Sequence, residues 1–264
     1  MICCGIDVGS LSGEAVLMEG ERVLGYSIVR TSHESATTAW EALELVLRDT
    51  GVPREEIACT VATGYGRVIV PFAQRNVSEI SCHARGANFV FPSARTILDM
   101  GGQDCKAIRC DEKGKLSSFL MNDKCAAGTG RAIEVIASLL EVELGDVGRL
   151  ALASTEDPPR ISNTCLLFAK SEILLLMREG VSVQALLAAL CHGVAERACE
   201  LLRKVGLEKD LVITGGIAKN LGVVSRIEEK LGMRALIPPE PQIIGALGAA
   251  ILAGELAGRG VSAH

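Results

Sequence analysis

The sequence contains the same pair of signals twice, and this repetition is the strongest constraint on its fold. One apolar run ends at Asp7 in GIDVGS, and another, TILDMGGQD, ends at Asp99 before two glycines. Each is followed later by an apolar run that ends in Thr-Gly, in CTVATGYGR (59–67) and LVITGGIAKN (211–220). Ordinary turns do not generally repeat the chemistry of their flanks, so the order predicts an internal duplication.

Helical patterns lie between these signals, with apolar residues at three- and four-residue spacing. Strands that alternate with helices predict α/β units. The stretch from Asp99 to the second Thr-Gly is much longer than its counterpart, so the second half should carry an insertion, at about 121–180. The helices are predicted at 36–48, 130–144, 165–178 and 183–205, with a small-residue helix at 243–256 that packs back on the first half.

We therefore expect two α/β lobes with a cleft between them. The first lobe is assigned to residues 1–92 plus 245–264, and the second to residues 93–244, which include the insertion. With 264 residues and 48% apolar content, the chain can bury a sizeable core without disulfides.

Charge and hydropathy exclude several classes of function. The net charge is −5 and no run of Lys or Arg occurs, so nucleic acid is not an expected partner. The N-terminus lacks the features of a signal peptide. The sequence also contains no stretch of about 18 uninterrupted apolar residues, which a membrane span would need. We expect a cytosolic protein whose ten cysteines are reduced and mostly fill the core.

The two aspartate turns have the chemistry of a phosphate site. A turn whose backbone N–H groups point inward binds anions, and glycine lets a phosphate approach the backbone closely. The sequence thus predicts that Gly9 with Ser10, and Gly101 with Gly102, hold a polyphosphate. No P-loop motif occurs, and no GxGxxG follows the first strand, which excludes two other kinds of nucleotide site.

The acidic residues of these turns predict a metal ion. A lone carboxylate would repel phosphate, so Asp7, with Asp99 or Asp104, makes sense chiefly when hydrated Mg²⁺ lies between carboxylate and phosphate. Gln103 and Asp104 are of the residue types that orient or deprotonate an attacking water. These two are the candidate catalytic residues.

The motif order resembles that of actin, sugar kinases and heat-shock chaperone ATPases (the ASKHA fold), whose ribonuclease-H-like lobes close on ATP. Within this superfamily the chain is most similar to the activator ATPases of 2-hydroxyacyl-CoA dehydratases, with related subunits of benzoyl-CoA reductases and double-cubane cluster protein reductases. The matching strings are GIDVGS (5–10), ATGYGR (62–67), SEISCHARGA (78–87), DMGGQD (99–104), MNDKCAAGTGR (121–131), SNTC (162–165), FAKSE (168–172), TGGIAKN (214–220) and GALGAA (245–250).

This resemblance implies an ATP-dependent one-electron donor. A homodimer would hold one [4Fe–4S] cluster on its twofold axis, with Cys125 and Cys165 of each chain as ligands. Such a cluster takes four thiolates, and two candidates per chain offer half of them. Ferredoxin or flavodoxin would supply the electron, an iron–sulfur dehydratase or reductase would accept it, and hydrolysis of ATP to ADP would drive the transfer through a conformational change.

Both cysteines lie at predicted helix starts, where the helix dipole stabilises anionic sulfur. Cys125 precedes GTGRAIEVIASLLEVEL, and Ser162 or Thr164 can cap the helix near Cys165.

The remaining contacts to the nucleotide follow from the resemblance. Gly128 and Thr129 can touch the nucleotide, and Gly215, Gly216 and Asn220 would lie near the adenosine. Glu14 departs from the family pattern, because relatives often carry lysine there, which leaves phosphate binding to backbone amides. Two other functions stay open: a small-molecule kinase with Asp104 as base, which would not explain the cysteine pair, and a non-redox ATP-sensing assembly protein.

Overall fold

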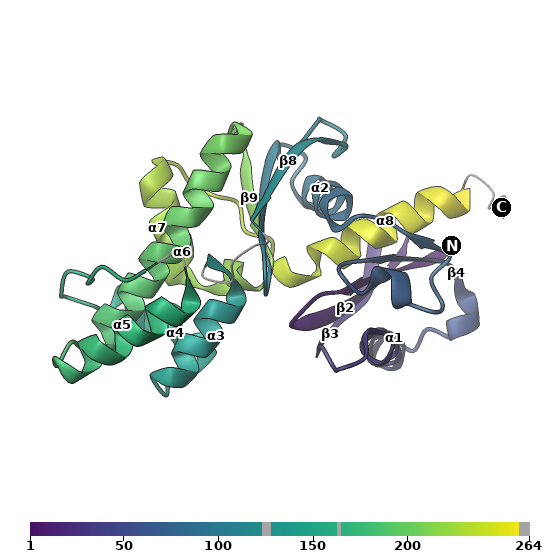
Figure 1. Cartoon of the computed structure of the whole chain (residues 1–264). Coiled ribbons are helices and arrows are strands. Elements are labelled where there is room, and N and C mark those ends of the chain that lie inside the picture. The colour runs from purple at the N-terminus through teal and green to yellow at the C-terminus, as the bar shows by residue number, and fades with distance from the viewer. Residues whose placement is uncertain (123–127, 163–164, 259–264) are drawn as a thin grey trace. The chain divides into compact units, whose positions relative to one another are not determined.

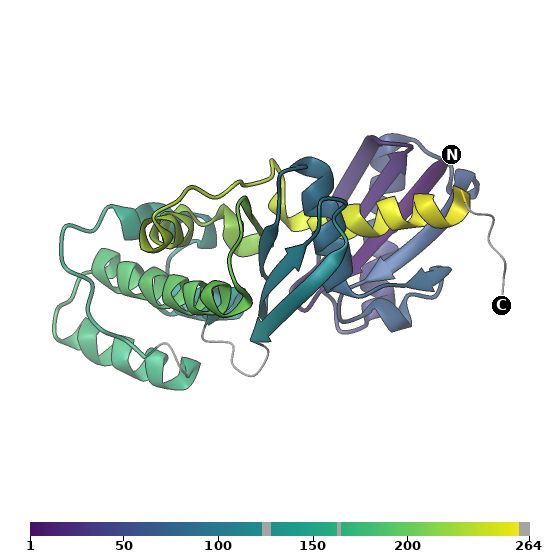
Figure 2. The same ribbon diagram turned by 90° about the horizontal axis from the view of Figure 1, so that it is seen from above.

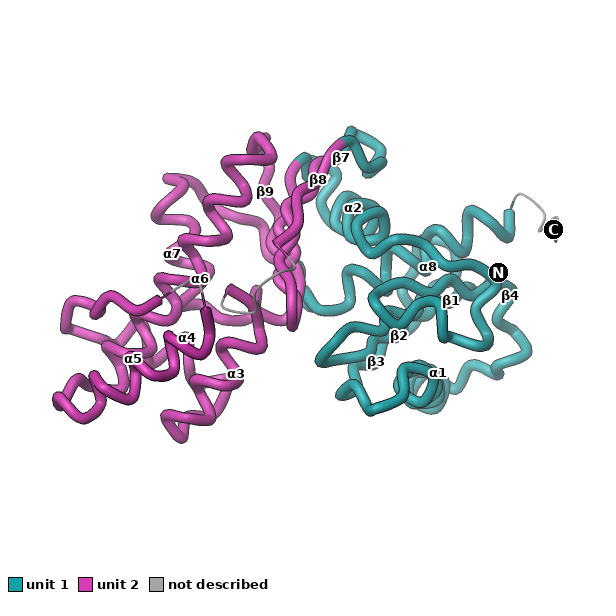
Figure 3. The backbone as a smooth tube through the Cα atoms, in the orientation of Figure 1, with its two compact units in different colours: residues 1–95, 110–117, 238–264 teal, residues 96–109, 118–237 magenta. Residues whose placement is uncertain are grey.

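The chain folds into two compact units, which Figure 3 distinguishes by colour. The computed structural model describes residues 1–122, 128–162 and 165–258. The first unit comprises residues 1–95, 110–117 and 238–264, and the second comprises residues 96–109 and 118–237. Each unit combines a mixed β-sheet with helices (Figure 1), so the predicted α/β class is confirmed.

The first unit has a five-stranded sheet in the order β3-β2-β1-β4-β5. Strand β1 pairs antiparallel with β2 and parallel with β4. Alternate side chains of β1 enter different cores, since Cys4 and Ile6 join the cluster that includes Leu43, while Cys3 joins another. The strands are β1 (Ile2–Val8), β2 (Ser12–Glu19), β3 (Arg22–Arg30), β4 (Ile57–Thr63) and β5 (Arg75–Asn76); the helices are α1 (Ser35–Thr50), α2 (Glu79–Val90) and α8 (Ile244–Gly258).

Helix α8 confirms the prediction of a small-residue C-terminal helix that packs on the first half. It lies across the strands of the first sheet (Figure 2) and packs against β1, β4 and α2. A Cβ on Gly248 would overlap the backbone of Cys82 in α2, so only glycine permits this approach. The window Pro241–Gly258 could span a membrane by length and composition alone, but 56% of it is buried inside the protein, as in a core helix.

The second unit has a four-stranded sheet in the order β8-β7-β6-β9. Strand β6 pairs antiparallel with β7 and parallel with β9. The strands are β6 (Thr96–Met100), β7 (Cys105–Cys110), β8 (Leu116–Asn122) and β9 (Leu211–Thr214); the helices are α3 (Gly130–Leu139), α4 (Val147–Leu152), α5 (Leu166–Arg178), α6 (Val183–Val205) and α7 (Leu221–Leu231). Short 3₁₀ turns, η1 (Arg54–Glu56), η2 (Arg67–Ile69), η4 (Leu144–Asp146), η5 (Gly216–Lys219) and η6 (Pro241–Ile243), lie between these elements.

Helix α3 is shorter than the predicted helix at 130–144. It ends at Leu139 because Glu141 adopts a left-handed conformation, with φ of 55°. The N–H of Val142 then bonds the carbonyl of Ala137 at 2.9 Å, and the N–H of Glu141 bonds that of Ser138 at 3.3 Å. These two bonds are those of a Schellman C-cap. The apolar pattern continued past the helix because Val142 also packs against the core, although Leu144 is exposed.

The prediction that most cysteines fill the core is confirmed. Eight of the nine described cysteines are buried, and Cys165 is the half-buried one. Burial raises the pKa of the Cys82 and Cys105 thiols to about 12, so both stay protonated at neutral pH. The buried set is Cys3, Cys4, Cys59, Cys82, Cys105, Cys110, Cys191 and Cys199.

Candidate functional site

In the first unit, the expected phosphate turn connects β1 to β2. Asp7 is buried near the end of β1, and its Cα partners across the sheet are Glu14 on β2 and Thr63 on β4. The turn closes with a hydrogen bond from the N–H of Gly9 to the carbonyl of Ser12, at 2.9 Å. This short hairpin turn leaves Gly9 and Ser10 partly exposed at its tip.

The second unit repeats this arrangement at the turn between β6 and β7. Asp99 is buried in β6, and its Cα partners are Lys106 on β7 and Thr214 on β9. The N–H of Gly101 donates to the carbonyl of Asp104 at 3.0 Å, which closes the turn in the same way. The duplication predicted from the motifs is therefore present in the strand register as well as in the order of the motifs.

The glycine of each Thr-Gly motif is required by its conformation and its surroundings. Gly64 and Gly215 both have φ of 82°, in the left-handed region that favours glycine. A Cβ on Gly64 would lie 2.8 Å from the carbonyl carbon of Val8, and one on Gly215 would lie 2.8 Å from that of Met100. In each unit the Thr-Gly backbone thus packs directly against the end of the strand that carries the aspartate.

The two units differ in the polar partners of their aspartates. The Lys106 ammonium, 2% exposed, donates to Asp104 Oδ1 at 2.5 Å and to Asp99 Oδ2 at 3.3 Å. The hydroxyl of Thr214 donates to Asp99 Oδ1 at 3.3 Å. The second unit therefore holds one buried cation against two buried carboxylates.

In the first unit, a histidine faces the aspartate. His83 on α2 is buried, and its Nε2 lies 4.0 Å from Asp7 Oδ2. Gly245, in the first turn of α8, leaves the space for this contact, since a Cβ there would lie 2.9 Å from His83 Nε2. The hydroxyl of Thr63 lies beside the Cys82 thiol and has no conventional hydrogen-bond partner in the described part of the chain.

The two predicted catalytic residues lie differently in the turn. Gln103 is exposed, whereas Asp104 is 2% exposed and bound to Lys106. The amide of Gln103 is thus available to a ligand, while the Asp104 carboxylate has one oxygen engaged by a lysine. The sequence alone assigned both residues to the attacking water and did not distinguish their surroundings.

The structure brings the turn at Gly101 and Gly102 next to the start of α3. The N–H of Gly130 donates to the carbonyl of Gly101 at 2.9 Å, and the N–H of Arg131 donates to that of Gly102 at 2.8 Å. Thr129, the buried N-cap residue, directly precedes these amides. Gly128 lies against Arg197 of α6, where a Cβ would approach the arginine Cδ to 3.0 Å.

The residues expected near the adenosine follow β9. Gly215 is buried and Gly216 is exposed at the start of η5. The side-chain oxygen of Asn220 accepts the N–H of Val223 at 3.1 Å and caps α7. Asn220 thus has a structural role as a helix cap, which leaves its amide nitrogen for a ligand.

Cys165 is the N-cap residue of α5 and lies partly exposed before the first helical turn. The prediction that Ser162 caps this helix is wrong, because Cys165 is the N-cap and the helix begins at Leu166, four residues after Ser162. The backbone N–H of Ser162 donates instead to Glu172 Oε2 at 2.5 Å, which ties this segment to α5. Thr164 and Cys125 lie outside the described residues.

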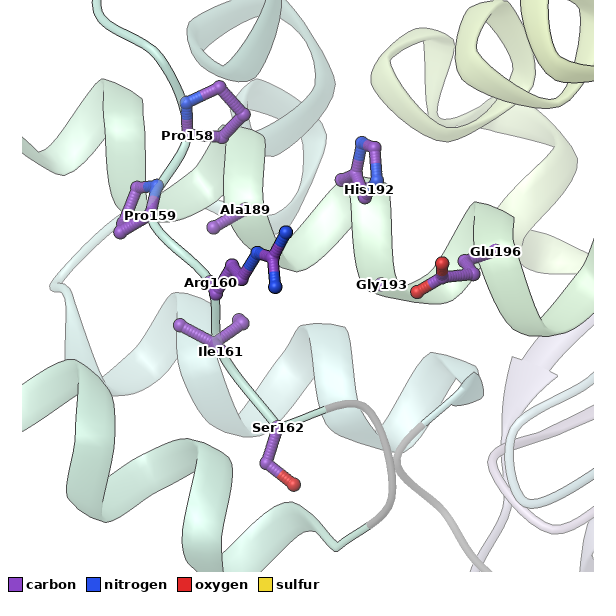
Figure 4. A pocket seen from close by; sticks show the side chains of 9 residues that line it. All are labelled: Pro158, Pro159, Arg160, Ile161, Ser162, Ala189, His192, Gly193 and Glu196. Atoms are coloured by element: carbon purple, nitrogen blue, oxygen red, sulfur yellow. The ribbon is translucent and has the colours of Figure 1, made fainter.

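A pocket of about 500 Å³ lies beside this segment, between α6 and residues 158–162 (Figure 4). The pocket's polar side chains are those of Arg160, Ser162, His192 and Glu196. Burial, with the nearby Lys230, lowers the pKa of His192 and favours the neutral imidazole. None of the residues predicted to bind the nucleotide lines this pocket.

Sequence reasoning did not single out Lys106 or assign a function to His83. The signal for Lys106 was its spacing, because it follows Asp99 by seven residues, as Glu14 follows Asp7. His83 lies in the SEISCHARGA string, but nothing in that string indicates which strand its helix covers.

Two α/β units with equivalent aspartate hairpins define the duplicated fold of the actin, sugar kinase and heat-shock ATPase class. A glucokinase of the ROK family from Streptomyces griseus has this fold, with a TM-score of 0.59 at 14% identity over 97% of this chain and 100% of that chain. The chain belongs to the BadF/BadG/BcrA/BcrD ATPase family, whose model matches residues 4–253.

Relatives of known role are similar over nearly their whole length. The activator of lactoyl-CoA dehydratase from Anaerotignum propionicum is 46% identical, over 97% of this chain and 99% of that protein. One of the subunits of benzoyl-CoA reductase from Thauera aromatica is 30% identical, over 95% and 92%. The activator of 2-hydroxyisocaproyl-CoA dehydratase from Clostridium difficile, solved with bound ADPNP, has a TM-score of 0.93 at 38% identity, over 98% and 96%.

Proposed function

We propose that this protein is an ATP-dependent activator that delivers single electrons to a partner iron–sulfur enzyme, such as a 2-hydroxyacyl-CoA dehydratase, a benzoyl-CoA reductase or a double-cubane cluster protein. The observation that carries the proposal is the contrast between its cysteines. Within an ATPase of this family, eight described thiols are buried, and Cys165 alone among the described cysteines is partly exposed, at a helix start. A thiol in that position is accessible to a metal, which binds cysteine as the thiolate.

The aspartate hairpins of the two units are the proposed sites for the phosphates of ATP. Backbone amides at Gly9 and Ser10 and at Gly101 and Gly102 would donate to phosphate oxygens. Mg²⁺, when bound, neutralises phosphate charge during hydrolysis. Asp7 would hold this ion through water, a role that fits a buried carboxylate at the base of a glycine turn.

Hydrolysis would be assisted from the second turn. Gln103 is exposed there and would orient the attacking water, with the Asp104 carboxylate beneath it. Thr129 and Gly128 link this turn to the chain that follows Cys125, and Gly215, Gly216 and Asn220 would lie near the adenosine.

Cys165 and Cys125 are the proposed cluster ligands, and two copies of the chain would supply four thiolates. A [4Fe–4S] cluster, when bound, supplies a one-electron redox centre. Residues of α5 fit a homodimer around such a centre, because Leu167 is 74% exposed, Phe168 66% and Leu175 56% on the helix that Cys165 begins. Ferredoxin or flavodoxin would reduce the dimer before it meets its acceptor.

Anaerobic purification with iron analysis tests this proposal. We expect a brown dimer with about four irons, and we expect Cys165→Ser to lose the iron. Cys191→Ser, a change of a buried thiol on α6, is the matched control and should retain it. A colourless protein without iron, even after reconstitution, would contradict electron donation, and ATP-dependent phosphorylation of an added small molecule would favour the kinase alternative.

A further inference from the structure

Lys106 is a buried group that the proposed function does not use. It lies opposite Asp99 in the β6–β7 hairpin, the position that Glu14 occupies opposite Asp7 in the first unit. An ammonium that is 2% exposed is rare unless carboxylates surround it, and here it contacts two, Asp99 and Asp104.

These contacts fix the turn between the two carboxylates. Asp99 belongs to the strand before the turn, and Asp104 is the residue that closes it through its carbonyl. Because one ammonium donates to both side chains, it links the strand before the turn to the residue that closes the turn. Gly101 permits this packing, since a Cβ there would lie 2.9 Å from Asp104 Oδ1.

The same turn accepts the first amides of α3. The carbonyls of Gly101 and Gly102 receive the N–H groups of Gly130 and Arg131, at 2.9 and 2.8 Å. These amides belong to the helix start, where no intrahelical acceptor exists. A displacement of the turn must therefore move the start of α3 or break both bonds. Gly130 follows Cys125 by five residues in the sequence.

We propose that Lys106 is a positioning residue that makes the 101–104 turn rigid, so that nucleotide binding at this turn is transmitted to the start of α3. This inference rests on the proposed function, because it takes the turn as a phosphate site. Lys106 acts through Asp99 and Asp104 and touches neither water nor phosphate in this role. The device connects the nucleotide to the part of the chain that carries a proposed cluster ligand.

Amide hydrogen exchange of the full-length protein, with and without saturating Mg·ADP, tests the inference. In the wild type, the nucleotide should slow exchange of the Gly130 and Arg131 amides by about tenfold. Lys106→Met should lose this nucleotide-dependent protection, and Lys106→Arg, which retains the charge and donors, should keep most of it. Lys204→Met, at an exposed site in the same unit, is the matched control and should behave as wild type.

The design separates positioning from simple loss of stability. A purely structural lysine would raise exchange equally with and without nucleotide, so wild-type protection ratios in Lys106→Met would overturn the inference. If Lys106→Met fails to fold, the double variant Asp104→Asn/Lys106→Met removes the shorter of the two ion pairs and leaves Asp99 with its hydrogen bond from Thr214. That variant should also lose the protection, and retention would again overturn the inference.

Calorimetry with Mg·ADP on the same samples distinguishes a failure of the Lys106 inference from a failure of the proposed function. Wild-type protein that binds ADP without protecting α3 would contradict the role of Lys106 and leave the proposed function intact. Wild-type protein that does not bind ADP would contradict the proposed function itself.

Discussion

Glu14 and Lys106 occupy equivalent positions in the two units and carry opposite charges. Each is the antiparallel partner of the aspartate near the end of the preceding strand, Asp7 for Glu14 and Asp99 for Lys106. Both side chains are buried, at 4% and 2% exposure. The same backbone arrangement thus carries paired carboxylates in one unit and an ammonium in the other, which indicates that the two hairpins have different electrostatic roles.

The first prediction concerns the charge at Glu14. Glu14→Gln should tighten binding of Mg·ATP by about tenfold, because it removes a buried negative charge beside the first phosphate turn, and tenfold corresponds to about 1.4 kcal/mol. Isothermal titration calorimetry measures this. Glu19→Gln, on the same strand but exposed, should leave the affinity unchanged. Weaker binding in Glu14→Gln would show that this carboxylate supports Asp7 or the metal.

The second prediction uses the matched threonines of the Thr-Gly motifs. Thr214→Val removes a buried hydrogen bond to Asp99 and should cost about 1–3 kcal/mol of stability. Thr63→Val removes a hydroxyl that lies only beside a thiol, and should change stability by less than about 0.5 kcal/mol. Thermal unfolding of the two variants measures these changes in stability. Equal losses of stability would contradict the difference in hydrogen bonding between the two units.

The third prediction compares two left-handed glycines of the second unit. Gly232→Ala, with φ of 63° and open space around it, should cost about 1 kcal/mol from backbone strain, or a midpoint shift of about 2–4 °C. Gly215→Ala should cost several times more, because its Cβ would also press on the Met100 carbonyl and on Asp99. Similar unfolding midpoints for both variants would show that β6 shifts away from the added Cβ at no cost in stability.

The fourth prediction concerns the thiols. Burial raises the pKa of Cys105 in the folded protein from its ordinary value of 9.0 to about 12, with the Asp99 charge adding to the effect. Its stabilising contribution is therefore fully present below about pH 9 and is lost as the pH rises toward 12. The unfolding midpoint of the wild type should fall as the pH rises through this range. The midpoint of Cys105→Ala should fall less steeply with pH.

Alkylation at neutral pH checks the same point in the protein freed of metal. Among the described cysteines, Cys165 should react first, because it is the partly exposed one. Modification of Cys105 or Cys82 at a comparable rate would mean that the cores open readily, and it would remove the contrast on which the cluster assignment depends.

Much of the fold followed from local signals in the sequence. The apolar runs fixed β1, β4, β6 and β9, since strands of this kind need only local apolar residues and a turn signal at their ends. The glycine-rich string at 243–256 identified a helix that must pack closely on another backbone, and α8 does so on α2. The end of α3 was missed, because the left-handed cap at Glu141 has no glycine to mark it.

By itself, the sequence determined which residues form the aspartate turns and the Thr-Gly motifs, because turn chemistry depends on residues that are neighbours in the chain. Only the tertiary structure decided how these turns are supported. It buried Asp104 against Lys106, placed His83 from α2 beside Asp7, and attached the start of α3 to the second turn. Such contacts depend on strand register and on packing between distant segments, and neither is encoded at one position of the chain.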